Sequence, residues 1–293
     1  MSNPMFKNAT FGGGTATLDR PVAGAEPVYQ SYPVPGDAPQ GGTAPGGYPP
    51  AQTPHAGRSM TFGGTASVAF LMLAVGAVAG WWGWTQVTTT PAPTLDRPDA
   101  VSVAIANSGF LWGSLIIGFI LAIGTAFVPK AARFTALPYS IAQGIVLGYI
   151  SHIYDSQTQG IAIQAALATI GVFGVMLALY GLRVLRATPK LVKGVIAATF
   201  GIVAMYAVGW IASMFGAGDT LRFWENSGPL GIGISLIIVG VAAFNLILDF
   251  DLIERGVKSQ APAYMEWYGA FALMMTLVWL YLEMLRLLSK LRD

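Results

Sequence analysis

The stretch FNLILDFDLIERGVKSQAPAYMEWYGAFALMMTLVWLYLEMLRLLSKLRD (residues 244–293) decides the fold. Two long apolar runs flank a short charged link, and carboxylates occur where hydrocarbon would be expected. Asp249 and Asp251 close the first run, and Glu283 lies well inside the second. A charge in an apolar segment of membrane-spanning length is costly unless it is paired, protonated or hydrated. These acids therefore indicate a functional site as well as a membrane fold.

The composition places the chain among integral membrane proteins. Its 293 residues are 54% hydrophobic and only 10% charged, against about 25% charged in an average soluble domain. The absence of cysteine excludes disulfides and thiolate sites, and a net charge of +2 gives no basic face for nucleic acid. The two histidines, His55 and His152, lie far apart and no hydrolase or dinucleotide motif occurs in a suitable context. We therefore expect neither an enzyme nor a bound cofactor.

Residues 1–60 differ from the rest of the chain in composition. They are rich in Gly, Pro, Ala, Thr and Gln, as in YPVPGDAPQGGTAPGGYPPAQTP (residues 32–54). Such a segment buries too little apolar surface to offset its ordering entropy, so we predict a disordered cytoplasmic tail. The tail lacks an apolar core of signal-peptide type. The simplest interpretation is a solvated tail with no specific role. Its tyrosines and PxxP-like spacing are a nonspecific signal for binding a membrane protein partner or for weak self-association.

Residues 61–293 are predicted to form an all-α, seven-helix transmembrane domain. About 20 residues are needed to span roughly 30 Å of hydrocarbon. Seven apolar runs fit, at about 66–86, 103–128, 136–154, 160–182, 194–215, 228–251 and 264–288. Only a short polar turn at 155–159 separates the third run from the fourth, which indicates a tight helical hairpin.

The distribution of Lys and Arg predicts the orientation in a plasma membrane. The links after the second, fourth and sixth runs carry Lys130, Arg133, Arg183, Arg186, Lys190, Lys193, Arg255 and Lys258, whereas the opposite links carry Arg97 and Arg222. This asymmetry places the tail in the cytoplasm and, after seven crossings, the C-terminus outside. The C-terminal Arg286, Lys290 and Arg292 favour the inside instead, so a half-buried final helix is the alternative.

Glycine pairs occur at spacings that allow close helix packing. Gly76 with Gly80, and Gly144 with Gly148, are each four residues apart. In a chain with 36 glycines we interpret them as sites of packing within one molecule rather than as a dimer interface.

The intramembrane acids allow two interpretations. Asp249 and Asp251 diverge by about 200° on one helix, so one should face the bundle and the other the cytoplasmic interface. Arg286 follows Glu283 by one turn, so these two can form a self-contained ion pair, with Asp249 merely hydrating its helix end. In the other interpretation, Asp249 and Glu283 face each other across antiparallel helices. Two close carboxylates in a low dielectric share a proton when protonated, and when ionised they repel or capture a hard cation such as calcium.

At these residues the chain resembles the Bax inhibitor-1/YccA family of transmembrane Bax inhibitor motif proteins. The resemblance lies in LDFDLIERG (248–256) and LVWLYLEMLRLL (277–288), with support from ALPYSIAQGIVLGYIS (136–151). SNPMFKN (2–8), RSMTFGG (58–64) and the Gly/Pro-rich tail are similar to the actinobacterial branch. The resemblance implies a seven-helix bundle with the last helix central. It also implies a pH-sensitive calcium leak controlled by an aspartate pair on the sixth and seventh helices.

By position, the aspartate pair of the family falls on Asp249 and Glu283, which would then form both the pH gate and the calcium site. Asp251 and Arg286 are auxiliary candidates, and the basic residue that caps the pair corresponds to Lys130 or Arg133. The pair is 34 residues apart, a longer interval than in the better-known members. Contact therefore requires that the sixth segment continue into the cytoplasm, or that residues 256–267 form an interfacial stretch.

The resulting expectation is a membrane protein that passes or senses calcium, gated by protonation of Asp249 and Glu283. A second hypothesis is a non-conducting adaptor that regulates a membrane protease or stress complex through its tail and cytoplasmic loops. A proton-coupled transporter of a small solute is a weaker third hypothesis, because few other polar residues lie within the membrane segments.

Overall fold

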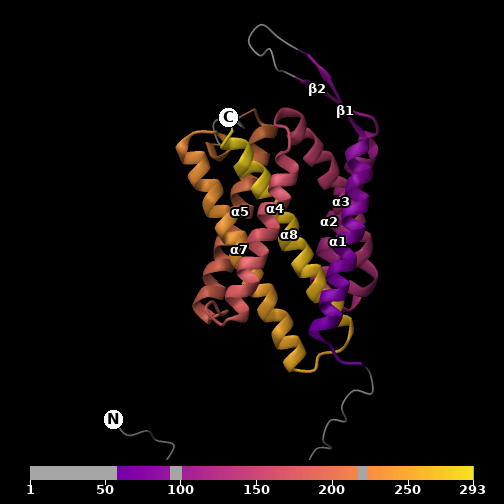
Figure 1. The fold of residues 1–293 in the computed structure, drawn as a ribbon, viewed down its shortest axis with the longest axis vertical. Coiled ribbons are helices and arrows are strands. Elements are labelled where there is room, and N and C mark those ends of the chain that lie inside the picture. The colour runs from indigo at the N-terminus through magenta and orange to yellow at the C-terminus, as the bar shows by residue number, and fades with distance from the viewer. Residues whose placement is uncertain (1–57, 93–100, 217–222, 293) are drawn as a thin grey trace, which may run out of the picture. The chain divides into compact units, whose positions relative to one another are not determined.

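The computed structural model describes residues 58–92, 101–216 and 223–292 (Figure 1). The predicted tail at 1–60 lies outside these ranges except for its last three residues. Within them, the long helices are α1 (Phe62–Thr85), α2 (Ser108–Phe127), α3 (Ala132–Gln157), α4 (Ile161–Gly181), α5 (Pro189–Met214), α7 (Pro229–Lys258) and α8 (Tyr264–Lys290). Two short 3-10 turns, η2 (Pro129–Ala131) and η3 (Phe223–Glu225), connect neighbouring helices.

Six of these helices are long and apolar enough to cross a membrane, namely α1, α2, α4, α5, α7 and α8. The chain is thus an all-α polytopic membrane protein, as expected. α3 is 26 residues long, or about 39 Å at 1.5 Å per residue, but it is less apolar. Three of its polar side chains are covered by neighbouring helices, since Tyr139, Ser140 and Tyr149 are each at most 1% exposed.

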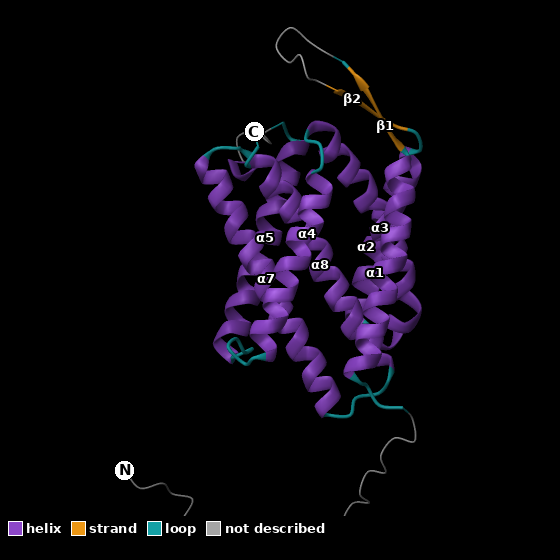
Figure 2. Cartoon of the chain, in the orientation of Figure 1, coloured by secondary structure: helices purple, strands orange, loops and turns teal. Residues whose placement is uncertain are grey.

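An antiparallel β-hairpin joins α1 to α2, where the sequence analysis expected no strand (Figure 2). Its strands are β1 (Val87–Pro91) and β2 (Val101–Ile105), with Val87 opposite Ile105. The predicted second segment began at residue 103 and was therefore too long, because α2 begins only at Ser108. The runs VTTTP and VSVAI are rich in β-branched residues, which favour extended strands.

α8 has neighbours on several sides. It packs against α1, α3, α4 and α7, and Figure 1 shows it crossing among the other helices. Its side chains Leu280 and Leu285 are completely buried, as is Leu246 of α7. Large apolar side chains of α2 and α5, such as Phe119 and Phe200, remain exposed on the outer surface, as lipid-facing residues do.

The glycine pairs bring α1 and α3 into direct backbone contact. A methyl group on Gly144 would overlap the carbonyl oxygen of Gly76, and one on Gly148 would overlap that of Gly80. The prediction that these glycines pack within one molecule is confirmed.

A short segment before α1 is fastened to the link between α7 and α8. The Met60 amide donates to the Ala261 carbonyl at 2.7 Å, and the Ala263 amide donates to the Arg58 carbonyl at 3.0 Å. The amide and the hydroxyl of Thr61 both donate to the buried Glu266 carboxylate of α8, at 3.0 and 2.8 Å. We call residues 58–61 the strap.

Candidate functional site

Asp249 lies on the side of α7 that packs against α8. The side-chain hydroxyl of Thr276, itself buried in α8, interacts with its carboxylate. The second carboxylate oxygen of Asp249, Oδ2, is buried and has no hydrogen-bond partner among the described residues. A buried carboxylate oxygen without a donor is energetically unfavourable. A proton or a cation on this oxygen would satisfy it.

Asp251 lies on a different side of the same helix, as the angle between the two acids predicts. It forms an ion pair with Arg255 one turn later, and its side chain is 19% exposed while that of Arg255 is 69% exposed. Asp251 therefore lies about two turns before the end of α7. Its charge is paired with Arg255, and its Oδ2 is buried and accepts no hydrogen bond from the described residues.

The register of α7 against α8 separates Asp249 from Glu283. Asp249 of α7 contacts Thr276 of α8, and Ser235 of α7 contacts Lys290 of α8. The second contact lies fourteen residues earlier on α7 and fourteen residues later on α8, as expected for antiparallel helices. By the same register Glu283 lies opposite Ala242, which is fully buried. Seven residues of α8 separate Thr276 from Glu283, or about 10 Å of helix rise.

The structure thus does not bring Asp249 and Glu283 together as the facing-pair interpretation required. α7 does continue to Lys258, beyond its predicted end at 251, but α8 already begins at Tyr264. Because the link between α7 and α8 is this short, residues at equal distances from it lie opposite each other. Glu283 is farther from the link along α8 than Asp249 is along α7, so the two acids do not meet. The self-contained pair of Glu283 with Arg286 is the arrangement that the structure shows.

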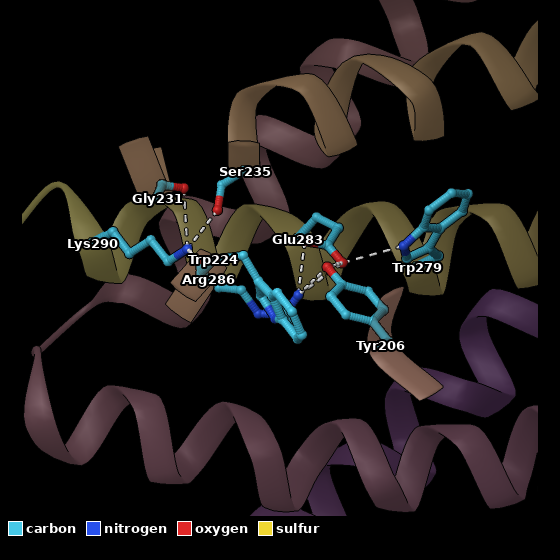
Figure 3. A network of polar contacts seen from close by, with 8 residues as sticks. All are labelled: Tyr206, Trp224, Gly231, Ser235, Trp279, Glu283, Arg286 and Lys290. Carbon is cyan, nitrogen blue, oxygen red and sulfur yellow. Dashed lines mark hydrogen bonds and ion pairs between the residues drawn. The ribbon is translucent and has the colours of Figure 1, made fainter. Parts of the chain in front are cut away.

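Glu283 is 1% exposed and receives donors from two helices (Figure 3). Arg286 Nη1 donates to both carboxylate oxygens at 3.0 Å, one turn along α8. Trp279 Nε1 donates to Oε1 at 3.2 Å, and the Tyr206 hydroxyl of α5 donates to the same oxygen at 2.9 Å. The charge of Glu283 is therefore compensated within the bundle.

Arg286 connects Glu283 to α5. Its Nη1 also donates to the Tyr206 hydroxyl, and its guanidinium carbon lies 5.0 Å from the centre of the Tyr206 ring. The side chain of Arg286 is 30% exposed, against 2% for Glu283. The spacing of Arg286 from Glu283 predicts this pair, whereas nothing in the sequence marks Tyr206 as a partner of Arg286.

Lys290 was counted only as a C-terminal charge, yet it is 5% exposed. Its ammonium donates to the Trp224 and Gly231 carbonyls and, at 2.8 Å, to the Ser235 hydroxyl (Figure 3). It thus fastens the end of α8 to η3 and to the first two turns of α7. Its place in the last turn of a helix is the only sequence signal for this role.

The two proposed capping residues lie elsewhere. Lys130 and Arg133 are exposed, and the guanidinium of Arg133 lies over the ring of the adjacent Phe134 at 4.6 Å. Arg286, not either of them, is the basic partner of Glu283. The described residues contain no cluster of three or more His, Asp or Glu side chains that could hold a metal ion.

A sequence model of one protein family, described as Bax inhibitor 1 like, matches residues 3–293. No curated protein and no solved structure matches the chain.

Proposed function

This chain belongs to the Bax inhibitor 1 like family, and from that premise we propose that it is a pH-sensitive cation leak, with calcium as the cation. In this proposal all seven long helices cross the plasma membrane, with the N-terminus in the cytoplasm. Asp249 acts as the site that binds either a proton or the cation. Glu283, already neutralised by Arg286, forms a second and separate station on α8.

The observation that carries the proposal is the buried, unpartnered Oδ2 of Asp249 between α7 and α8. A hard cation such as calcium prefers carboxylate and hydroxyl oxygens, and the Thr276 hydroxyl adds one beside the carboxylate. One carboxylate and one hydroxyl are too few ligands for tight binding, which suits transient passage rather than storage. A proton on Asp249 removes its charge and with it the attraction for a cation.

The proposed orientation is supported by the C-terminal cations. Arg286 is paired with Glu283, and Lys290 is saturated by backbone carbonyls and Ser235. Arg292 donates to the Gln159 carbonyl at 3.2 Å and to the Gln164 side chain at 2.6 Å. Because protein groups bind all three, they oppose an outside C-terminus less than free charges would.

Calcium flux into proteoliposomes at a series of pH values tests the proposal. We expect flux to rise with pH in the wild type, because Asp249 loses its proton and gains affinity for the cation. Asp249→Asn should show a low flux that no longer depends on pH. Asp251→Asn is the matched control, since Asp251 lies two residues away and is paired with Arg255. An unaltered pH dependence in Asp249→Asn and in Glu283→Gln would contradict the proposal.

A second candidate function is that of a non-conducting adaptor, and the strap favours it. Residues 58–61 follow the tail directly and are bonded to the α7–α8 link and to Glu266. A partner that pulls on the tail would therefore act on the start of α8. Deletion of residues 1–57 separates the two functions, since an adaptor should lose its partner while a leak should keep its flux.

A further inference from the structure

The bundle has a polar cavity at the end where α8 terminates. Its volume is about 270 Å³ and it is lined by Tyr154, Glu225, Arg286, Ser289 and Lys290. Cavities for drug-sized ligands measure about 300–1,000 Å³ and are mostly apolar. A smaller cavity with only polar residues in its lining fits a small hydrated ion or a lipid headgroup.

Arg286 has donors to offer to such a ligand. A guanidinium carries five N–H groups. Among the described residues, every hydrogen bond of Arg286 runs through Nη1, to Glu283 and Tyr206. The edge formed by Nε and Nη2 is thus left over, on a side chain that is 30% exposed. This edge is the planar fork that binds two oxygens of a carboxylate or phosphate at once.

The remaining lining residues indicate the sign and the shape of the ligand. The ammonium of Lys290 donates its three N–H groups to Trp224, Gly231 and Ser235, so it contributes positive charge rather than a free donor. The hydroxyls of Ser289 and Tyr154 add two hydrogen-bonding groups. Two cations and the single acid Glu225 line this cavity, and Glu283 already balances the charge of Arg286. The C-terminus of α8 disfavours an anion, so binding depends on these side chains.

We propose that this cavity binds a phosphate group, either as a free ion or as the headgroup of an anionic lipid. Phosphate suits the lining better than a carboxylate does, because its oxygens point in more than two directions. Two of them can meet the Arg286 fork while others reach the Ser289 and Tyr154 hydroxyls. The site is separate from Asp249 and does not depend on cation flux.

Binding is measured on the purified full-length protein. In detergent, inorganic phosphate is titrated by calorimetry, with chloride at equal ionic strength as the reference. In nanodiscs, the thermal midpoint is compared between pure phosphatidylcholine and phosphatidylcholine with added phosphatidylglycerol. A response to inorganic phosphate indicates a free ion, and a response confined to phosphatidylglycerol indicates a lipid headgroup. No response beyond chloride in the first arm and none in the second overturns the proposal.

Variants locate the site. Arg286→Lys keeps the charge beside Glu283 but removes the fork, so we expect binding at least tenfold weaker in a folded protein. Ser289→Ala should weaken binding severalfold, and Glu225→Gln should strengthen it because it removes the opposing charge. Arg292→Gln is the matched control, a cation at the same helix end that does not line the cavity. Equal weakening by Arg292→Gln and Arg286→Lys would show diffuse electrostatic attraction and overturn the proposal.

Discussion

Glu283 shows how a single acid is tolerated in the core of a membrane bundle. Three donors reach its carboxylate, from Arg286 and Trp279 on its own helix and from Tyr206 on α5. Two of these follow from helical spacing alone, at i−4 and i+3, and only Tyr206 depends on tertiary structure. Hydrogen bonds and an ion pair therefore stabilise the carboxylate of Glu283, whereas Oδ2 of Asp249 receives no hydrogen bond from the described residues.

Removing the charge of Glu283 should destabilise the protein, mainly because Arg286 would then keep a positive charge without a counter-charge. In Glu283→Gln the guanidinium loses its counter-charge while it remains largely buried. Breaking a buried ion pair costs about 3–5 kcal/mol, and the 30% exposure of Arg286 reduces this to about 2 kcal/mol by solvent screening. Chemical denaturation in detergent measures the loss.

The double variant Glu283→Gln/Arg286→Gln is the test of this cause. It removes both charges, so it should recover most of the lost stability. If the double variant is as unstable as the sum of both single variants, the ion pair is not the origin of the effect.

At the level of elements, α1 and α3 form the tightest helix pair. Gly76 and Gly80 of α1 lie against Gly144 and Gly148 of α3, so the two backbones touch where side chains would normally intervene. In lipid, where apolar burial gives no preference for protein over solvent, such close packing is a principal source of helix association.

Gly148→Ala should therefore destabilise the protein. Its methyl group would overlap the Gly80 carbonyl, and overpacking of this kind costs about 1–3 kcal/mol. Gly171→Ala in α4 is the control, because open space surrounds that glycine and alanine favours a helix by up to about 1 kcal/mol. Thermal unfolding in detergent compares them, and equal midpoints would refute a backbone contact at Gly148.

Sequence periodicity and composition predicted all seven long helices and about half of their ends to within two residues. Apolar length locates a lipid-exposed helix but does not identify short strands. Residues 103–105 of β2 were included in the second predicted span, and β1 was assigned to the link before it. The register of α7 with α8 escaped prediction for a different reason. It depends on where the chain turns between Lys258 and Tyr264, and a shift of two turns decides whether Asp249 faces Glu283 or Thr276.

At the level of the whole molecule, the strap joins the first helix to the last two. Met60 is 2% exposed and is packed in the same core cluster as α7 and α8. Glu266 of α8 accepts hydrogen bonds from Thr61 of the strap. Its carboxylate lies so close to α1 that a methyl group on Gly64 would overlap it. The sequence offered no signal for these contacts, because they join residues about 200 positions apart whose types are common in loops and helix ends.

Met60→Ala should lower the free energy of unfolding by about 2–5 kcal/mol, as truncation of a buried methionine does. Met214→Ala provides the control, since Met214 is 68% exposed and surface changes stay within about 0.5 kcal/mol. Denaturant titration in detergent measures both. A similar small effect in the two variants would show that Met60 does not anchor the strap.

Two truncations examine the strap as a unit. Deletion of residues 1–57 removes only sequence ahead of the strap and should leave the thermal midpoint unchanged. Deletion of residues 1–61 also removes the Met60 anchor and the Thr61 donors to Glu266, so it should lower the midpoint by several degrees. Equal midpoints for the two truncations would show that the strap adds no stability.

The partner of α1 is α3 rather than its neighbour in sequence, and this has a consequence for synthesis in the cell. Thr85 and Ala132, the facing ends of the two helices, are separated by a stretch that takes about 2–9 s to translate at roughly 5–20 residues per second. During that time the glycine surface of α1 rests against lipid or against the insertion machinery. α8, which packs against four helices, is made after the other six long helices. Biogenesis must therefore hold half-paired helices in the bilayer until α8 arrives, and a premature stop codon before α8 would leave α1, α3, α4 and α7 without the helix that contacts all four.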